Sequence, residues 1–575
     1  MFRKLLVAAL TFLLCNAAWA DTGATIDIQG VSDAILDNVR GNLSLYQQRE
    51  HPLLSEAVIQ RLHGLAPEEI RHALEPFGFY RPHIDAELLK TGDHWTARYV
   101  IDTGPRIKMD KVAIELRGAG SSDSALLNWR ATYPIQVGDG LDHALYERSK
   151  QELLQLTRER GYFSAELITH RITVDLKTYQ ASIELEIDTG PRYVFGTVNM
   201  QNEKFKESFL HRYLTFKPGD PYDARKLLNL RRTLADSDFF ARADVITLVE
   251  QANDQQVPII VDLEAKPDRR YSAGLGYATD TGPRARLGYE RRRANTRGHH
   301  YNAFAERSEI EASFKARYFV PLRRPATDAL SYSFTWLDEN TVTSARTTTS
   351  VGTEITQQTG AWLRTAGVSF EREHYRVDIS NDSNLLIPHV SWQRVHADQR
   401  IAPTHGWSLT FGVRGAREGI LSDTSFVQPR AQGRYIFSPS SRSRVLLRAT
   451  GGYSWVPDFQ DLPVSQRFFA GGDNSIRGYA FSSLGPANAD GVIVGGKNLL
   501  VGSAEYEHTL FGRTALALFM DAGNAFDNTA FHAMRGAGFG LRWSTPIGSV
   551  RLDLAQALSL PDRPWRLHLT LGPDL

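Results

Sequence analysis

The segment WRLHLTL at residues 565–571 places large apolar side chains at every second position, with Arg566, His568 and Thr570 between them. Because successive side chains of a β-strand point to opposite faces, this pattern predicts a strand with one apolar and one polar face. The same two-residue period recurs in YSAGLGYA (271–278), ASFKARY (312–318), LSYSFTW (330–336) and AGFGLRW (537–543). We therefore predict that residues 267–575 form a single all-β module.

Three features of this module favour a transmembrane β-barrel over a soluble sandwich, which would also alternate. Lysine and arginine lie centrally on the polar faces, aromatic residues recur near the strand ends, and the module is large for a sandwich. The mean hydropathy of −0.32 fits a barrel wall, because lipid-facing and lumen-facing residues average out. At about 19 residues per strand and connection, the module holds about 16 antiparallel strands.

The first twenty residues have the features of a secretory signal peptide. Arg3 and Lys4 precede an apolar stretch at 5–14, and the small-residue pattern that ends at Ala20 predicts cleavage before Asp21. The single cysteine, Cys15, lies inside this segment. The exported chain is therefore expected to contain no disulfide and no cysteine-based metal or nucleophile site.

The segment between the signal peptide and the barrel contains an internal repeat. IDTGPR occurs at 101–106 and again at 187–192, and GFY at 78–80 is echoed by GYF at 161–163. Three units result, at 21–104, 105–190 and 191–266, each with the order strand, helices, strand, strand. In the second unit, Asp142 is expected to cap a helix that ends at Arg160, before Gly161. The edges of such small sheets can accept an added strand, although a rigid spacer is the alternative.

A glycine-rich run, RFFAGGDNSIRGY at 467–479, interrupts the alternation of the barrel. With FMDAGN at 519–524 and PIGSVRLD at 546–553, it resembles the motifs of the BamA/TamA superfamily of outer-membrane assembly factors and two-partner transporters. The repeats resemble POTRA domains, the periplasmic modules of that superfamily, and three such units are most similar to its TamA branch. The resemblance implies α+β POTRA repeats followed by an all-β barrel, with a long loop around 466–490 folded inward.

The loop motif comprises Ile476, Arg477, Gly478 and Tyr479. A guanidinium that points into a barrel lumen needs a carboxylate acceptor on the wall. We predict that Arg477 pairs with Asp521, with Glu505 as an alternative or second partner. The pair would hold the loop inside the barrel, while Gly478 permits a tight turn and Tyr479 packs on the lumen wall.

The first and last barrel strands are expected to pair and close the barrel. The resemblance implies that this seam opens laterally and templates incoming strands, whereas an ordinary firm seam is the alternative. The glycines of the first strand offer few side chains to pack across it. The lateral-gate residues are Tyr271, Gly274, Gly276, Tyr277, Trp565, Leu567, Leu569 and Leu571. A third DTGPR copy at 280–284 is interpreted as a hairpin turn without a functional role.

The resemblance implies an outer-membrane assembly factor that inserts or translocates autotransporter-like or β-barrel cargo, with the POTRA arm in the periplasm of a Gram-negative cell. The implied partners are outer-membrane lipid, unfolded outer-membrane proteins and a TamB-like protein anchored in the inner membrane, with no nucleic acid. We expect no enzymatic activity, cofactor or metal, because the sequence lacks G-x-S-x-G, H-E-x-x-H and P-loop motifs. The alternatives are a two-partner secretion pore and an outer-membrane hydrolase.

Overall fold

The computed structural model describes residues 24–572 except 52–53, 93, 203, 378–379, 400–401, 528–530 and 546–547. The expected signal peptide and its cleavage site at Ala20 and Asp21 therefore lie outside the described residues. Within them, no helix has both the length and the apolar character needed to cross a membrane. The chain falls into two compact units, of which the first ends at Val198 but also includes Phe216–Leu228 and Thr247–Ile259.

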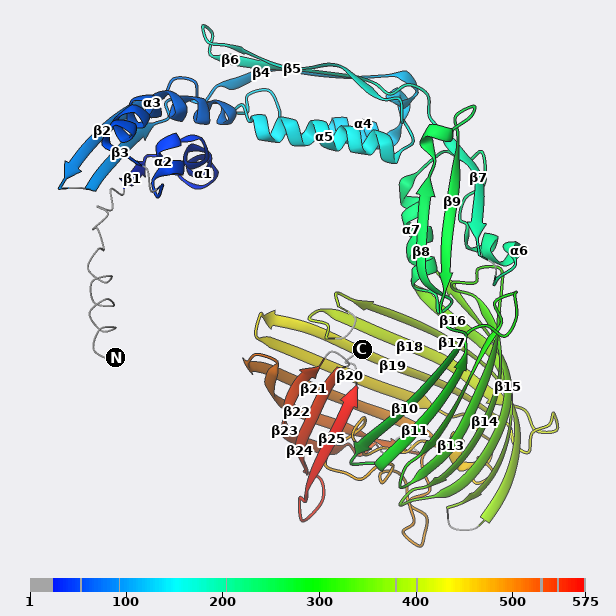
Figure 1. Ribbon diagram of the computed structural model, residues 1–575. Helices are drawn as coiled ribbons and strands as arrows, with labels where there is room; N and C mark the ends of the chain where they lie inside the picture. The colour runs from blue at the N-terminus through cyan, green and yellow to red at the C-terminus, as the bar shows by residue number, and fades with distance from the viewer. Residues whose placement is uncertain are drawn as a thin grey trace, which may run out of the picture. The chain divides into compact units, whose positions relative to one another are not determined.

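The first repeat is a three-stranded sheet covered by helices (Figure 1). Strand β3 lies in the middle, parallel to β1 and antiparallel to β2. Tyr99 and Ile101 of β3 are buried against Ile59 and Ile70 of the longest helix, so the sheet and the helix share one apolar core. The elements are β1 (Ala24–Gln29), α1 (Asp33–Asn42), α2 (Ser44–Gln48), α3 (Glu56–Leu74), η1 (Glu75–Phe77), β2 (His83–Thr91) and β3 (His94–Asp102).

The second repeat has the same architecture, with β6 between β4 and β5. The predicted helix is confirmed, since the Asp142 side chain accepts a hydrogen bond from the Leu145 backbone N–H at 2.9 Å and the helix ends before Gly161, whose φ is +89°. The elements are β4 (Lys108–Arg117), η2 (Gly118–Ser122), α4 (Ser124–Ala131), α5 (His143–Glu159), β5 (Glu166–Asp175) and β6 (Gln180–Asp188).

The third repeat again places its last strand in the centre, in the order β7-β9-β8. Its segment 206–212 also contacts the barrel: the Lys206 N–H donates to the Thr296 carbonyl at 2.9 Å, and Arg212 donates to the Pro321 and Leu322 carbonyls at 3.1 and 3.0 Å. The elements are β7 (Val194–Gln201), α6 (Glu207–Leu210), η3 (His211–Tyr213), α7 (Ala224–Ala235), β8 (Phe240–Thr247), η4 (Val249–Gln251) and β9 (Gln256–Ala265).

The repeated arginine of IDTGPR makes the same contacts at both junctions between repeats. Arg106 donates to the Phe77 carbonyl at 2.7 Å and to the Leu141 carbonyl at 2.9 Å. Phe77 precedes the glycine that follows the helices of one repeat, and Leu141 precedes the residue that caps the long helix of the next. The guanidinium therefore ties the end of one repeat to the start of the following helix.

Arg192 repeats this arrangement, donating to the Arg160 carbonyl at 3.1 Å and to the Tyr222 carbonyl at 3.3 Å. This junction also carries ion pairs from Arg160 to Asp123 at 3.0 Å and to Asp223 at 3.2 Å. The hydrogen bond from the Arg225 side chain lowers the pKa of Asp223, against the opposing effect of burial. IDTGPR is thus more than a turn, because its arginine joins consecutive repeats.

The barrel is a sheet of 16 strands in sequence order, each antiparallel to its neighbours, which confirms the predicted fold class. Tyr332, Phe334 and Trp336 are exposed on one face of β14, as expected for a lipid-facing wall. The strands are β10 (Arg269–Ala278), β11 (Gly282–Arg291), β12 (His300–Arg307), β13 (Glu311–Pro321), β14 (Ala329–Asn340), β15 (Ala345–Thr359), β16 (Trp362–Arg376), β17 (Ser380–Ala397), β18 (Gly406–Ala416), β19 (Phe426–Ser440), β20 (Ser443–Tyr453), β21 (Asn498–Phe511), β22 (Thr514–Phe526), β23 (Met534–Thr545), β24 (Gly548–Ala557) and β25 (Trp565–Gly572).

The first and last strands, β10 and β25, lie side by side but do not pair (Figure 1). The prediction that they form a ladder is wrong for the described residues, where the sheet ends at β10 on one side and at β25 on the other. The physical reason is visible at Leu569, whose backbone N–H donates to the Thr279 hydroxyl at 2.9 Å instead of to a backbone carbonyl of β10. The barrel is therefore nearly closed, with an unpaired seam.

Candidate functional site

The long loop between β20 and β21 is the candidate functional element. These two strands pair directly, with Tyr453 opposite Asn498, so the loop leaves the wall and returns at neighbouring points. It contains a short 3-10 helix, η5 (Val464–Gln466), which is followed directly by the glycine-rich run. Phe468, Ala470 and Ile476 are buried, which places this part of the loop against the wall instead of in solvent.

Arg477 is the centre of the loop's contact with the wall. Its Nε donates to Asp521 Oδ2 at 2.7 Å and its Nη2 to Asp521 Oδ1 at 2.9 Å, a bidentate arrangement. Its Nη1 donates to Glu505 Oε2 at 2.7 Å and to Asp553 Oδ2 at 3.0 Å. The structure thus brings Arg477 together with both residues named from the sequence and with a third carboxylate, on β24.

Two further contacts fix this guanidinium in place. The Arg477 backbone N–H also donates to Asp521 Oδ2, at 3.0 Å, and the guanidinium carbon lies 3.5 Å from the centroid of the Phe519 ring. The Arg477 side chain is 5% exposed and that of Asp521 is fully buried. Because water is largely excluded, each charge depends on its protein partners for solvation.

A second buried arginine, Arg542 of β23, shares Glu505 and Asp553 with Arg477 and was not identified from the sequence. It forms ion pairs with Glu505 at 2.7 Å and with Asp553 at 2.5 Å, and approaches Glu507 at 3.4 Å. Its place on the polar face of AGFGLRW indicated a lumenal cation. Strand periodicity, however, does not say which side chains meet across strands.

The neighbours of Arg477 in the motif fit closely against the wall. Gly478 has φ of +96°, and a Cβ there would lie 2.9 Å from the Ala557 backbone nitrogen. The Tyr479 hydroxyl donates to the Arg535 carbonyl at 3.0 Å. Conversely, a Cβ at Gly536 of β23 would lie 2.0 Å from the Arg477 carbonyl oxygen. A wall glycine is therefore needed for the loop backbone to approach this closely.

The predicted gate residues border the unpaired seam and face outward. Five of them are between 50% and 71% exposed, namely Tyr271, Tyr277, Trp565, Leu567 and Leu571. The neighbouring Leu275, which was not among the predicted residues, is 92% exposed. Leu569 is half-buried, Gly274 has open space around its Cα, and Gly276 lies against the Arg284 side chain. None of these side chains belongs to the Arg477 cluster, so loop anchoring and seam are separate parts of the candidate site.

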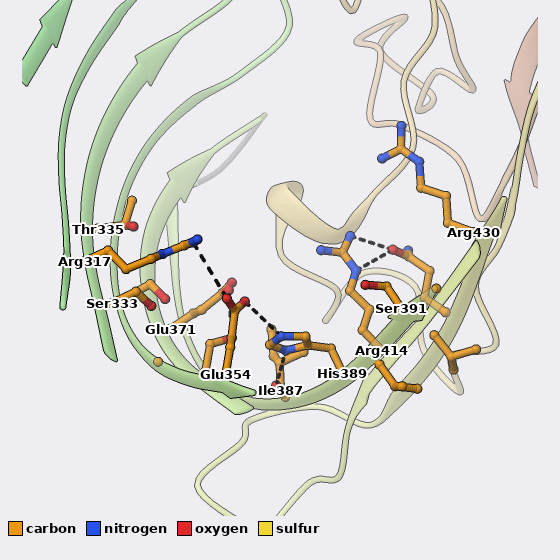
Figure 2. A pocket seen from close by; sticks show the side chains of 17 residues that line it. Arg317, Ser333, Thr335, Glu354, Glu371, Ile387, His389, Ser391, Arg414 and Arg430 are labelled. Carbon is orange, nitrogen blue, oxygen red and sulfur yellow. Dashed lines mark hydrogen bonds and ion pairs between the residues drawn. The ribbon is translucent and has the colours of Figure 1, made fainter. Parts of the chain in front are cut away.

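The opposite wall of the lumen carries a polar cavity of about 430 Å³ (Figure 2). Glu354 joins His389 at 3.2 Å and Arg317 at 3.7 Å, while Arg414 donates to Gln428 at 2.6 and 2.8 Å. The second nitrogen of His389 faces the Ile387 carbonyl at 3.4 Å. Both nitrogens of this histidine are therefore occupied without a serine hydroxyl, while the Ser369 hydroxyl donates to Glu371 Oε1 at 3.3 Å in the same cavity.

One group among the described residues has the spacing of a metal site: Asp280, Asp473 and His568 offer ligand atoms within 4.8 Å of one another. His568 Nδ1 is bonded to Asp473, and His568 Nε2 accepts the Gly478 N–H at 2.8 Å. A histidine with both nitrogens engaged has no lone pair free for a metal. This group is therefore a hydrogen-bonded junction, and it gives the turn at 279–281 contacts that the sequence interpretation did not foresee.

Comparisons with known proteins match three parts of the chain. Residues 295–572 match the Omp85 superfamily domain, residues 25–103 the POTRA domain described as TamA domain 1, and residues 193–266 a POTRA domain described as a surface antigen variable number repeat.

Among curated proteins, the chain is 24% identical to the outer membrane protein assembly factor BamA of Nitratidesulfovibrio vulgaris, over 61% of this chain and 46% of that protein. It is also 24% identical to BamA of Neorickettsia risticii, over 71% of this chain and 58% of that protein. The chain thus spans about half the length of these relatives. The crystal structure of Haemophilus ducreyi BamA lacking POTRA domains 1–3 has the same fold, with a TM-score of 0.68 at 16% identity over 81% of this chain and 99% of that one.

Proposed function

We propose that this protein, an outer-membrane β-barrel with an Omp85 superfamily domain and periplasmic POTRA domains, assembles other proteins into or across the outer membrane. The observation that carries the proposal is the unpaired seam between β10 and β25. Each of these strands has one edge without a paired neighbouring strand, and an incoming extended segment can pair with such an edge. The seam is therefore a lateral gate at which a substrate strand is added.

The loop contributes a fixed support for this gate. Arg477 holds the loop to β21, β22 and β24 through Glu505, Asp521 and Asp553, so the loop lies against the part of the wall that leads to β25. A wall braced in this way stays folded while its free edge binds substrate. The same loop lies inside the barrel against its wall, which argues against a freely conducting pore.

The proposed substrates are unfolded outer-membrane proteins, either autotransporter-like or β-barrel cargo, with outer-membrane lipid as the surrounding partner. The match of residues 25–103 to TamA domain 1 supports the TamA branch. It also supports a TamB-like partner, anchored in the inner membrane, that docks through the POTRA arm. We propose no enzymatic activity and no cofactor, since the sequence lacks the G-x-S-x-G, H-E-x-x-H and P-loop motifs.

A reversible lock across the seam tests this function. Cysteine pairs are introduced between 274–278 and 567–571 in a chain whose single native cysteine, Cys15, lies in the expected signal peptide. Oxidation should stop assembly of an autotransporter barrel in proteoliposomes, and reduction should restore it. A matched pair at Val351 and Phe370, opposite each other on β15 and β16, should leave assembly unaffected when oxidised. Full activity with the seam locked would contradict the proposal.

A further inference from the structure

We propose that Asp473 of the loop is a latch that holds the two unpaired ends of the barrel sheet together. Three segments meet at this residue: the end of β10 with its turn, at Thr279 and Asp280; the loop itself; and β25, at His568 and Leu569. The inference goes beyond the proposed function, because it assigns the closed state of the seam to side chains of the loop.

The contacts form one continuous chain of hydrogen bonds. The Leu569 N–H donates to the Thr279 hydroxyl at 2.9 Å, and that hydroxyl donates to Asp473 Oδ1 at 3.3 Å. The Asp473 backbone N–H donates to Asp280 Oδ2 at 2.7 Å. Asp473 therefore contacts the β10 side of the seam through both its side chain and its backbone.

The β25 side is held through His568. Because the Gly478 N–H donates to His568 Nε2 at 2.8 Å, that nitrogen is an acceptor and the ring proton resides on Nδ1. His568 Nδ1 then donates to Asp473 Oδ1 in a short contact. Two loop residues, Asp473 and Gly478, thus bind the same histidine of the last strand, one at each ring nitrogen.

Burial makes these bonds difficult to replace with water. His568 is 1% exposed and Asp473 is 8% exposed. When a buried polar group loses its hydrogen-bond partner, the free-energy cost of its desolvation is no longer compensated. Partial opening of the junction is therefore unfavourable. The junction should therefore switch between a fully formed and a fully broken state, which is the behaviour required of a latch.

The same loop carries Arg477 four residues later, bound to the wall at Asp521. The loop therefore bridges a fixed part of the barrel and the seam. Seam opening requires that Asp473 is released from Thr279 and Asp280 while Arg477 stays bound to the wall. Opening also frees the Leu569 N–H, which becomes available to a backbone carbonyl of an extended polypeptide. Only this last step, the identity of the incoming strand, rests on the proposed function.

Seam distances measured without cargo test the latch. Spin labels at Leu275→Cys and Leu567→Cys, on the outward faces of β10 and β25, are compared in purified full-length protein in lipid nanodiscs. The labelled protein with an unaltered latch should give one narrow distribution of distances between positions 275 and 567. Thr279→Val, which keeps the shape of threonine but removes its hydroxyl, and His568→Phe should each add a longer-distance population. Thr279→Ser, which keeps the hydroxyl, should restore the narrow distribution.

Two controls separate latch opening from general damage. A label pair at Val351 and Phe370 should not change in any variant, and Asp490→Asn, at an exposed position of the same loop, should leave the seam closed. Amide exchange at Leu569 should be about fivefold to tenfold faster in Thr279→Val if its hydrogen bond is lost. A folded Thr279→Val protein with unchanged seam distances and unchanged Leu569 exchange would overturn the latch. Assembly activity is assayed separately, so the latch and the proposed function can fail independently.

Discussion

Replacement of Arg477 by glutamine should destabilise the barrel strongly, because it removes the cation of a buried cluster. In the structure, Asp521 forms its ion pair with Arg477, whereas Glu505 and Asp553 keep Arg542 as a partner. Loss of Arg477 therefore removes the ion pair of one fully buried carboxylate, which keeps only the weaker electrostatic attraction of Arg448. Breaking a buried pair in this way costs about 3–5 kcal/mol. The hydrogen bonds that the Arg477 guanidinium donates to Glu505 and Ser503 are lost as well.

The arrangement also predicts which second substitution rescues the first. Asp521→Asn removes the orphaned charge, so the double variant should recover more of the free energy of unfolding than Arg477→Gln combined with Glu505→Gln. The interaction energy between positions 477 and 521 should lie at the upper end of the roughly 0.5–3 kcal/mol range for contacting residues. Arg513→Gln, at an exposed turn, is the matched control and should change stability by less than about 0.5 kcal/mol.

The assay is urea unfolding in lipid vesicles, followed by tryptophan fluorescence and by the mobility of the folded barrel in gels. A loss below about 1 kcal/mol for Arg477→Gln would refute the assignment of a dry, paired cluster, since that is the range of exposed ion pairs. Equal rescue by Asp521→Asn and by Glu505→Gln would refute the division of partners between the two arginines.

Three further predictions follow, one on the close approach of the loop to the barrel wall and two on the arm. Gly536→Ala should cost about 1–3 kcal/mol of barrel stability, because its Cβ would lie 2.0 Å from the Arg477 carbonyl, whereas Gly433→Ala, with its nearest atom at 4.0 Å, should be tolerated in the same urea assay. Arg106→Gln should broaden the distribution of distances between spin labels on the first and second repeats, because the hydrogen bonds that join the repeats are lost. A distribution of unchanged width would argue against this role of Arg106. The lowered pKa of Asp223 means that its contribution to stability is present above the ordinary aspartate pKa of about 3.9 and is lost as the pH falls through its own lower value. Amide exchange in Ala224–Ala235, corrected for intrinsic rates, should therefore accelerate at low pH less in Asp223→Asn than in the parent chain.

Local patterns in the sequence predicted the elements well, because each is set by near neighbours. Alternation at 565–571 and 330–336 depends only on the two faces of a strand, and Asp142 and Gly161 determine the ends of their helix through local hydrogen bonds and φ. The two copies of IDTGPR, at 101–106 and 187–192, likewise contain the ends of β3 at Asp102 and of β6 at Asp188.

Relations across strands were beyond the reach of the sequence. Arg542 and Asp553 meet the Arg477 cluster because of the register among β21, β22, β23 and β24, which periodicity does not specify. The expectation that β10 and β25 pair came from the need to satisfy every backbone group in lipid. At Leu569 that need is met by the hydroxyl of Thr279, a side chain from a turn, and no sequence pattern indicated this substitution.

Photocrosslinking from the seam tests the central claim, that substrate strands are added between β10 and β25. A photoreactive residue at Leu275 or Leu567, both exposed at the seam, is compared with one at Phe334, an exposed wall residue of β14. During assembly of a barrel cargo, positions 275 and 567 should crosslink to the cargo while position 334 does not. Crosslinks of equal strength at all three positions, or cargo captured only at 334, would contradict the account.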